Sequence, residues 1–525
     1  MKLPRFARAV SFPAALLLLS LTASAELRLP KLWSDHAVIQ RDRPIHVWGW
    51  ADAGRRVTAT LQQANGGVEE TGSAVTDSLG HWSVYLAPRP AGGAAYTLTV
   101  SDDRPMGGRS LLVFDLLMGD VWLASGQSNM ELPLLGFPGS AVLKNGPEEI
   151  KAANHPEIRL LHEPKRFSYF PLQDQDATWQ ICTPETAATF SAVAYFFARE
   201  IQHDQKVPVG VVEADWGGTP AESWISLDTL GNDAALMPVF AARAADMDKQ
   251  ADAEAIKARF ALEDAEAKAQ GRKPEEHPWE PPVEPWAASS LYNGMIAPVT
   301  PLGIRGVIWY QGEANTGLAR APLYHRLFSS MIGDWRRQFA QGNFPFLFVQ
   351  ISSYEASPEE DWGMVRDAQR RTLSVAGTGM AVSLDVGDRN NVHPADKQTV
   401  GHRLALAARA LSYGEEIHHS GPLFRQATTE GGGMRVYFAG ADGKLAVHGG
   451  TLEGFELAAA DHHFVAATAK FDADGASVTV TSPQVAMPVY VRYAWPNAPD
   501  ATLMDSAELP ASTFTSEAVP TPPVH

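Results

Sequence analysis

A serine and a histidine that lie far apart in the sequence are of the residue types that ester cleavage requires. Ser128 stands in the run Gly-Gln-Ser-Asn-Met at 126–130, where a short apolar strand passes into a turn that would expose the hydroxyl at the edge of a sheet. A serine hydroxyl is a weak nucleophile until a neighbouring base removes its proton. His393, which precedes a proline just before an expected helix, is a candidate for that base. Taken singly, each motif is more often structural than catalytic, so the prediction depends on finding both.

The turn around Ser128 departs from the nucleophile elbow of α/β-hydrolases. Gly126 lies two residues before the serine, as in the G-x-S-x-G pattern, but Met130 stands where the second glycine belongs. We therefore set that superfamily aside.

Four blocks of sequence together resemble the sialate O-acetylesterase family, a branch of the SGNH hydrolases. They lie at 119–130, 210–224, 309–315 and 392–404, and their order and separation also agree with the family. The resemblance extends over essentially the whole mature chain. It implies that Ser128 is the nucleophile, that His393 is its base, and that no cofactor is needed.

The resemblance also implies donors for the oxyanion that forms during acyl transfer. The backbone N–H of Ser128 is one, and the N–H of Gly217 or of Gly218 is the second, with the choice between the two glycines left open. Gln311 matches the position where the broader superfamily uses an asparagine, so its amide is the third expected donor. Losing one such donor typically lowers the rate by about 10²–10³.

The third member of a catalytic triad is the weakest part of the pattern. Histidine bases are usually oriented by a carboxylate, yet Asn390 and Asn391 stand where relatives place an aspartate. Asp388 is the expected substitute, with Asp385 as an alternative. A dyad without any carboxylate is the third possibility.

Several side chains in the blocks are candidates for contact with a sugar. Trp216, Trp309 and Tyr310 have rings that can stack on a pyranose, although each alone is as often part of a core. We expect Glu313 to orient the site or stabilise its loop rather than to act as an acid.

These motifs require a scaffold, and the pattern of the chain predicts three zones. Short alternating strands at 26–110 indicate a small antiparallel β-sandwich. Buried strands alternate with helices at 111–412, which predicts an α/β domain with a parallel sheet flanked by helices, SGNH-hydrolase-like in the light of the resemblance. The β pattern returns at 413–515, and a loose tail follows at 516–525. Each chemical motif comes directly after a strand of the middle zone, so we expect one shared site at the carboxyl edge of the sheet.

An insertion interrupts the alternation at 236–286. Residues 241–271 are rich in Ala, Glu, Asp and Lys and predict an exposed helix, and a Pro-rich segment follows at 277–285. We favour a solvated helix over a moving lid.

The composition excludes other classes of protein. The chain has 525 residues, with 43 Lys and Arg against 60 Asp and Glu, and a formal net charge of −17. So acidic a chain lacks the basic face that nucleic-acid phosphates require, and no nucleic-acid partner is expected. The single cysteine, Cys182, rules out an internal disulfide. The histidine pairs at 418–419 and 462–463 lack ligand spacing, so no metal site is expected.

The first 25 residues have the pattern of a secretory signal. Lys2, Arg5 and Arg8 precede an apolar run at 12–21, and small residues at 23–25 supply a cleavage site. The apolar run is too short to span about 30 Å of hydrocarbon. We therefore expect a periplasmic or secreted protein with no stable membrane anchor after cleavage.

The resemblance implies a serine esterase that removes O-acetyl groups from carbohydrates through an acetyl-enzyme. It points first to O-acetylated sialic acid, and acetylated plant hemicellulose (xylan or xyloglucan) is the alternative. A rival of a different class is a noncatalytic carbohydrate-binding protein, which would release no acetate. A glycosidase would need two opposed carboxylates, and the blocks supply no clear pair.

Overall fold

The computed structural model describes residues 26–67, 69–104, 110–139, 142–273, 285–440 and 444–518, except for the side chains of 246–256. The expected signal at 1–25, part of the Pro-rich segment and the end of the expected tail lie outside these residues. Within them, no helix combines the length and the apolar character that crossing a bilayer requires.

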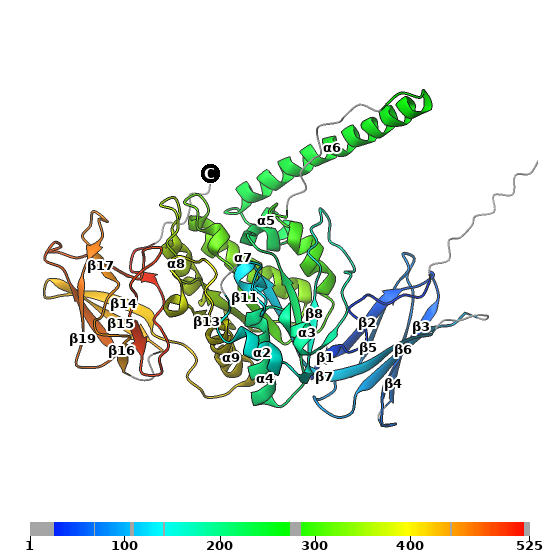
Figure 1. Ribbon diagram of the computed structural model, residues 1–525, viewed down its shortest axis with the longest axis horizontal. Helices are drawn as coiled ribbons and strands as arrows, with labels where there is room; N and C mark the ends of the chain where they lie inside the picture. Colours follow the sequence, from blue (N-terminus) through cyan, green and yellow to red (C-terminus); the bar gives the residue numbers. More distant parts are fainter. Residues whose placement is uncertain are drawn as a thin grey trace, which may run out of the picture.

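An antiparallel β-sandwich forms the N-terminal region (Figure 1). One layer is the pair β2–β5, and the other is β4–β3–β6, which continues into β7. Every second residue of β3 and β5 is buried, because residues two apart in a strand point to the same face. The strands are β2 (Ile45–Trp50), β3 (Arg56–Gln63), β4 (Glu69–Val75), β5 (His81–Leu86) and β6 (Tyr96–Asp102).

One long strand joins this region to the centre of the molecule without a break. β7 (Ser110–Gly126, 17 residues) pairs antiparallel with β6 through its first half and parallel with two central strands through its second half. β1 (Val38–Gln40) adds to β7 in parallel. Residue 110, where the first predicted zone ends, is the first residue of this continuous strand.

The central sheet has the order β13-β12-β11-β7-β10-β8-β9. Adjacent strands in this sheet run parallel, except that the edge strand β9 is antiparallel to β8. The α/β class is confirmed, with an antiparallel edge that the pattern did not predict. The strands are β8 (His155–His162), β9 (Gln180–Cys182), β10 (Val209–Asp215), β11 (Gly306–Tyr310), β12 (Phe346–Gln350) and β13 (Thr378–Val382).

Helices cover both faces of the central sheet. Trp122 of β7 packs edge-on against Phe197 of α4, with ring centroids 4.9 Å apart, and Trp309 of β11 packs against Trp335 of α7 at 5.7 Å. Trp309 is paired in register with Ser125 of β7, so the two side chains point to the same face of the sheet. Ser125 lies three residues after Trp122, and side chains alternate between faces along a strand, so Trp122 and Trp309 point to opposite faces. Since α9 packs on α4 and α8 on α7, each face carries one of these pairs.

The helices and short helical turns have the following bounds. The α-helices are α1 (Ser128–Glu131), α2 (Gly146–Ala152), α3 (Pro184–Ala188), α4 (Ala192–Gln205), α5 (Leu227–Gly231), α6 (Met237–Ala269), α7 (Tyr324–Phe339), α8 (Trp362–Thr372) and α9 (Lys397–Tyr413). The short turns are η1 (Ala221–Trp224), η2 (Tyr292–Ile296), η3 (Ala297–Val299), η4 (Glu313–Asn315), η5 (Ala321–Leu323) and η6 (Leu384–Val386).

The insertion begins as a single helix of 33 residues, α6, which projects away from the body (Figure 1). Its first turns are anchored, because the buried Arg243 lies over the ring of Tyr169 with 4.5 Å between the guanidinium carbon and the ring centroid. Most described side chains at 257–269 are exposed. This is the surface expected of a solvated helix.

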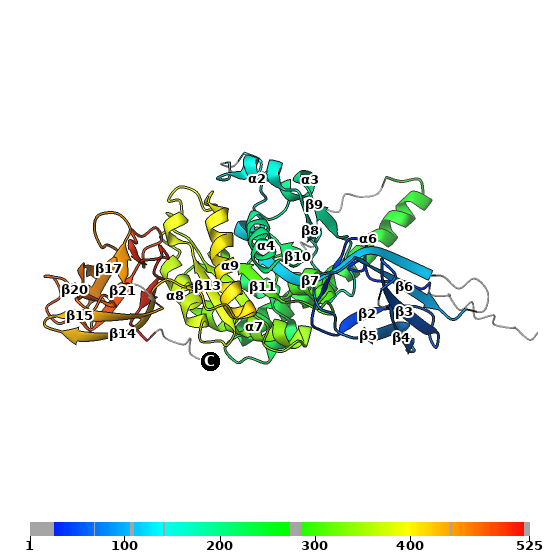
Figure 2. The ribbon, with the colours of Figure 1, turned by 90° about the horizontal axis from the view of Figure 1, so that it is seen from below.

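The C-terminal region consists of small antiparallel sheets at the opposite end of the molecule from the sandwich (Figure 2). They have the orders β14-β15-β20-β19, β18-β17-β21-β23 and β16-β22. The strands are β14 (Leu423–Glu430), β15 (Gly433–Ala439), β16 (Leu445–Val447), β17 (Phe455–Ala458), β18 (Val465–Ala466), β19 (Thr468–Phe471), β20 (Ser477–Thr481), β21 (Tyr490–Tyr493), β22 (Leu503–Asp505) and β23 (Phe514–Thr515).

One buried arginine fastens this region to the central body. Arg366 of α8 is fully buried and donates to the backbone carbonyls of residues 494–497 and to the hydroxyl of Thr513. It also donates to the carbonyl of Ser352, just beyond β12. Burial lowers the pKa of this guanidinium to about 9.

The single thiol lies in the edge strand of the central sheet. Cys182 is the last residue of β9 and is fully buried. Burial raises the pKa of its thiol to about 12, so the thiolate is scarce at neutral pH.

Replacing Arg366 with methionine should destabilise the protein strongly. Each buried carbonyl that loses its only strong donor costs about 1–3 kcal/mol, so we expect the free energy of unfolding to fall by at least about 3 kcal/mol. Urea denaturation followed by tryptophan fluorescence measures this. Arg371→Met on the same helix is the matched control, because its half-buried side chain bonds Asp367 alone among the described residues, and its loss should cost less than about 1 kcal/mol. Equal losses in the two variants would contradict this role.

Candidate active site

The turn that carries Ser128 is fixed by close contact between the ends of two strands. Gly126 ends β7 with a φ of 145°, and a Cβ there would lie 2.1 Å from the carbonyl oxygen of Tyr310, so only glycine fits. The N–H of Gln127 donates to that same carbonyl at 3.0 Å. α1 then begins at Ser128, which puts its hydroxyl at the carboxyl edge of the sheet.

The structure brings Ser128 and His393 into direct contact. His393 lies in the loop between η6 and α9, and its Nε2 is 2.8 Å from Ser128 Oγ although the residues are 265 positions apart. The ring of Phe137 meets the imidazole edge-on at 5.5 Å. The 2.8 Å between Nε2 and Oγ is the distance at which an imidazole accepts a proton from a hydroxyl.

The surroundings of His393 favour its neutral form. Burial lowers the pKa of the imidazole below its ordinary value of 6.5, and the positive charge of Lys397 lowers it further, while Glu131 acts in the opposite direction. At neutral pH the ring is therefore unprotonated and able to act as a base.

No carboxylate of the described residues bonds the imidazole, which corrects the expectation for Asp388. Asp388 is exposed, and its Oδ1 accepts from the N–H of Asn390 at 2.8 Å, because the loop folds back on itself there. Asp385 is held by both terminal nitrogens of Arg403 at 2.7 Å. Among the described residues Ser128 and His393 thus form a pair without a carboxylate, which is the arrangement of the third possibility considered from the sequence.

One expected oxyanion donor lies beside the serine but is occupied. A Cβ on Gly217 would lie 3.2 Å from the Cβ of Ser128, so the glycine allows a close approach. Its N–H donates to Oε2 of Glu131 at 2.6 Å, and Lys165 holds the other oxygen at 2.5 Å. The N–H groups of Ser128 and Gly218 make no hydrogen bond to another described residue. The sequence prediction missed Glu131, although it lies only three residues after the serine.

Gln311 does not point toward the serine, and this differs from the prediction. Its side chain is fully buried, and its amide nitrogen donates to Asn315 Oδ1 at 2.7 Å and to the carbonyl of Thr219 at 3.3 Å. Its amide oxygen accepts from the hydroxyl of Tyr324 at 3.0 Å. The chain turns sharply at Gly312, directly after β11, and the amide of Gln311 connects buried loops. Both N–H groups of this amide are already donated, so neither is free for an oxyanion.

Two of the predicted sugar-stacking rings belong to the core. Trp309 and Tyr310 are fully buried, and Trp309 lies edge-on to Trp224 at 6.0 Å. Trp216 is half-buried beside Phe167, with 6.2 Å between ring centroids, and remains the candidate wall of the site.

A buried polar network links the serine turn to the histidine loop. Asn129 donates to the carbonyl of Val392 at 3.0 Å and to Oε1 of Glu313 at 2.5 Å, and its own oxygen accepts from Lys397 Nζ at 2.5 Å. Burial lowers the pKa of Lys397 to about 7 and raises that of Glu313. The buried Glu313 therefore bonds the serine turn through Asn129, and its expected role in orienting the site or stabilising its loop stays a prediction.

Burial favours the protonated form of the carboxyl groups on β10 and beside it. Burial raises the pKa of Glu213 to about 8 and raises those of Glu163 and Asp215 well above their usual range. The site therefore carries less negative charge than the residue types indicate. Within the described residues no group of three or more His, Cys, Asp or Glu side chains is placed to hold a metal ion.

Comparisons with known proteins identify the family. A profile for carbohydrate esterase, sialic acid-specific acetylesterase, matches residues 269–410. The sialate O-acetylesterase of Rattus norvegicus is 31% identical over 410 residues, 72% of each chain, and that of Homo sapiens is 30% identical over 406 residues, 72% of this chain and 69% of its own. The crystal structure of a carbohydrate acetylesterase from Xanthomonas citri is 36% identical and covers 94% of this chain and 100% of its own, with a TM-score of 0.77.

The fold and these likenesses define a carbohydrate esterase, and thus a carboxylic ester hydrolase. The chain belongs to the sialate O-acetylesterase family. The resemblance read from the four blocks and the SGNH-hydrolase-like α/β class are both confirmed.

The pH dependence of hydrolysis should follow the lowered pKa of His393. Because the base must be unprotonated, kcat/KM should rise with pH through an inflection below 6.5. Glu131→Gln removes the negative charge that raises this pKa, so the inflection should move to lower pH. Rates with p-nitrophenyl acetate between about pH 4 and 8 measure it. Glu148→Gln, an exposed glutamate of α2, is the control, and an inflection that both variants leave unmoved would argue against the assignment.

Replacing Asn129 with alanine should lower kcat by about 10²-fold, because a misplacement of about 1 Å in a catalytic group has that effect. The change removes the bond to the carbonyl of Val392 and leaves Lys397 and Glu313 without their neutral bridge. Steady-state kinetics with p-nitrophenyl acetate, together with a thermal unfolding curve, test this. Asn154→Ala, an exposed asparagine, is the control. A folded Asn129→Ala protein with unchanged kcat would refute the role.

Proposed function

We propose that this protein removes O-acetyl groups from carbohydrates through an acetyl-enzyme on Ser128, with His393 as general base and then general acid. The observation that carries the proposal is the 2.8 Å contact between Ser128 Oγ and His393 Nε2 in a chain of an esterase family. The half-buried Trp216 beside this contact offers a ring for the sugar.

The reaction proceeds in two stages. Ser128 Oγ attacks the acetyl carbon while its proton passes to His393 Nε2, and the imidazolium then gives that proton to the sugar oxygen as the ester bond breaks. Water next attacks the acetyl-serine, with His393 again taking the proton. Acetate leaves and the serine hydroxyl is restored.

The developing oxyanion is held by backbone N–H groups in this proposal. The N–H of Ser128 and that of Gly218 have no described partner, and Gly217 becomes the further donor when the substrate displaces Glu131 from it. Lys165 pairs with the other oxygen of Glu131, so the carboxylate keeps a cationic partner when it leaves this N–H.

O-acetylated sialic acid is the first substrate proposed, because sialate O-acetylesterase is the name of the relatives. Acetylated hemicellulose is the second candidate, because the solved relative from Xanthomonas citri is named as a carbohydrate acetylesterase without restriction to sialic acid. Export to the periplasm or beyond is part of the proposal and rests on the signal pattern of residues 1–25.

Ser128→Ala and His393→Ala should each lower acetate release by at least about 10³-fold. Acetate is measured with p-nitrophenyl acetate, O-acetylated sialic acid, acetylated xylan and acetylated xyloglucan as substrates. Ser125→Ala, three residues earlier in β7, is the matched control and should keep its activity. Activity that survives in Ser128→Ala would refute the nucleophile. Acetate release from none of these substrates by the unaltered protein would favour a noncatalytic carbohydrate-binding protein.

A further inference from the structure

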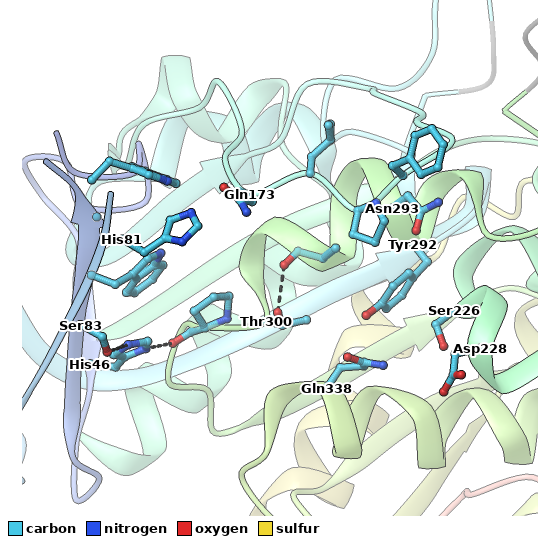
Figure 3. A pocket seen from close by; sticks show the side chains of 18 of the residues that line it. His46, His81, Ser83, Gln173, Ser226, Asp228, Tyr292, Asn293, Thr300 and Gln338 are labelled. Carbon is cyan, nitrogen blue, oxygen red and sulfur yellow. Dashed lines mark hydrogen bonds between the residues drawn. The ribbon is translucent and has the colours of Figure 1, made fainter. Parts of the chain in front are cut away.

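A second large concavity lies between the N-terminal sandwich and the central body (Figure 3). We name it the aromatic cleft; its volume is about 740 Å³. One wall is formed by β2 and β5, and the other by the loop at 169–173 with residues 226–228, 292–301 and Gln338. Neither Ser128 nor His393 lines it, so the aromatic cleft is separate from the candidate active site.

The strand wall of the cleft is a stacked row of rings. His46 and Trp48 of β2 alternate onto the same face as Tyr85 of β5, because His46 and Tyr85 are paired in register. The rings of His46 and Tyr85 lie 4.5 Å apart with an interplanar angle of 7°, and those of His46 and Trp48 lie 4.9 Å apart at 21°. Tyr85, at the end of the row, is 66% exposed. His46 covers one face of the Tyr85 ring, and the outer face of this exposed ring fits the C–H face of a sugar.

The other face of the same two strands prevents the row from turning inward. Ile45, Val47, Val84 and Leu86 are at most 4% exposed and belong to the sandwich core. Because a shift of one residue would exchange the two faces, the register fixes the rings toward the cleft.

The charge of the cleft favours a neutral ligand. Asp228 is its one carboxylate, and no lysine or arginine is among the described residues that line it. Burial lowers the pKa of His46. Its Nδ1 lies 3.1 Å from the carbonyl of Pro301, which can only accept, so Nε2 of the neutral ring accepts from the hydroxyl of Ser83 at 2.8 Å. An anionic sugar would find no lysine or arginine partner among the described residues that line the cleft.

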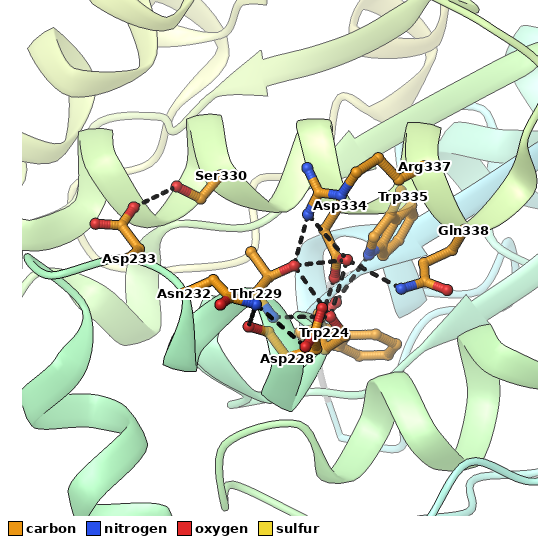
Figure 4. Close-up of polar contacts among 11 residues, drawn as sticks. Trp224, Asp228, Thr229, Asn232, Asp233, Ser330, Asp334, Trp335, Arg337 and Gln338 are labelled. Carbon is orange, nitrogen blue, oxygen red and sulfur yellow. Dashed lines mark hydrogen bonds and ion pairs between the residues drawn. The ribbon is translucent and has the colours of Figure 1, made fainter.

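The opposite wall offers polar groups whose positions are set by a buried aspartate (Figure 4). Asp334 is fully buried and accepts from the hydroxyls of Ser226 and Thr229, each at 2.8 Å, and from Nε2 of Gln338 at 3.3 Å. This leaves Oε1 of Gln338 without a bond to another described residue. The amide of Gln173 is exposed and likewise makes no hydrogen bond to another described residue. These groups can accept from and donate to sugar hydroxyls.

One segment connects the cleft to the candidate active site. Lys165 bonds Glu131 beside the serine, Phe167 packs against Trp216, and Leu172 lines the cleft. From 165 to 172 the chain spans at most about 25 Å when fully extended. A single oligosaccharide of several sugar units can reach both places.

We propose that the aromatic cleft binds a neutral segment of the glycan whose acetyl group is removed at Ser128. The link to hydrolysis rests on the proposed function, whereas binding in the cleft does not. Occupation of the cleft holds a long chain near the serine, so the sites cooperate on polymers and not on single sugars.

The test uses the full chain with Ser128→Ala, so that binding is measured without turnover. Calorimetric titration with cellohexaose and xylohexaose provides neutral chains, and 3′-sialyllactose provides an anionic one. We expect at least one neutral hexasaccharide to bind, no binding of 3′-sialyllactose in the cleft, and a loss of affinity of about tenfold or more on adding Tyr85→Ala or Phe170→Ala. Both side chains are largely exposed, at 66% and 69%, so the variants should fold.

Phe114→Ala is the matched control, because Phe114 is 49% exposed in β7 and does not line the cleft. It should bind the hexasaccharide as the parent does, and thermal unfolding should show that all variants fold. The proposal is overturned if Tyr85→Ala and Phe170→Ala bind as tightly as the parent, if neither hexasaccharide binds, or if 3′-sialyllactose binds and Tyr85→Ala abolishes it. Because binding needs no turnover, failure of the proposed hydrolysis would leave these results unchanged.

Discussion

The side chain of Asn129 joins the two halves of the candidate site. Its amide nitrogen donates to the carbonyl of Val392, the residue before the histidine, while its backbone follows the serine directly. The hydroxyl and the imidazole lie 265 positions apart in the sequence, so this bond ties together two loops that the chain does not connect directly. A buried lysine and a buried glutamate fix the amide in turn, so a polar network inside the core determines a contact at its surface.

The features that the sequence predicted are those carried by contiguous residues. Ser128 and His393 stand in compact blocks, and buried strands between helices indicate the α/β class. The direction of a single side chain after a strand is a different matter. Gln311 turns inward because Gly312 bends the chain. The carboxylate of Asp388 accepts a hydrogen bond from Asn390 within its own loop. Neither outcome follows from residue type and spacing, since both depend on the exact path of the backbone.

The unbroken strand β7 fixes the position of the N-terminal sandwich relative to the central sheet. The strand that ends beside Ser128 begins in the sheet of the N-terminal sandwich, and the sandwich supplies the ring-lined wall of the cleft. A flexible linker at this point would let the two binding places drift apart. With a hydrogen-bonded strand instead, the fold sets the separation of the serine from the cleft, as the proposed binding of one glycan chain at both places requires.

Chemical modification of Cys182 can measure how often the edge of the central sheet opens. The chain has a single thiol, buried at the end of an edge strand and scarcely ionised at neutral pH. An alkylating reagent can therefore modify the molecule only while β9 is detached from β8. The rate of that modification, measured by mass spectrometry, gives the frequency with which the sheet opens at this edge, without any engineered residue.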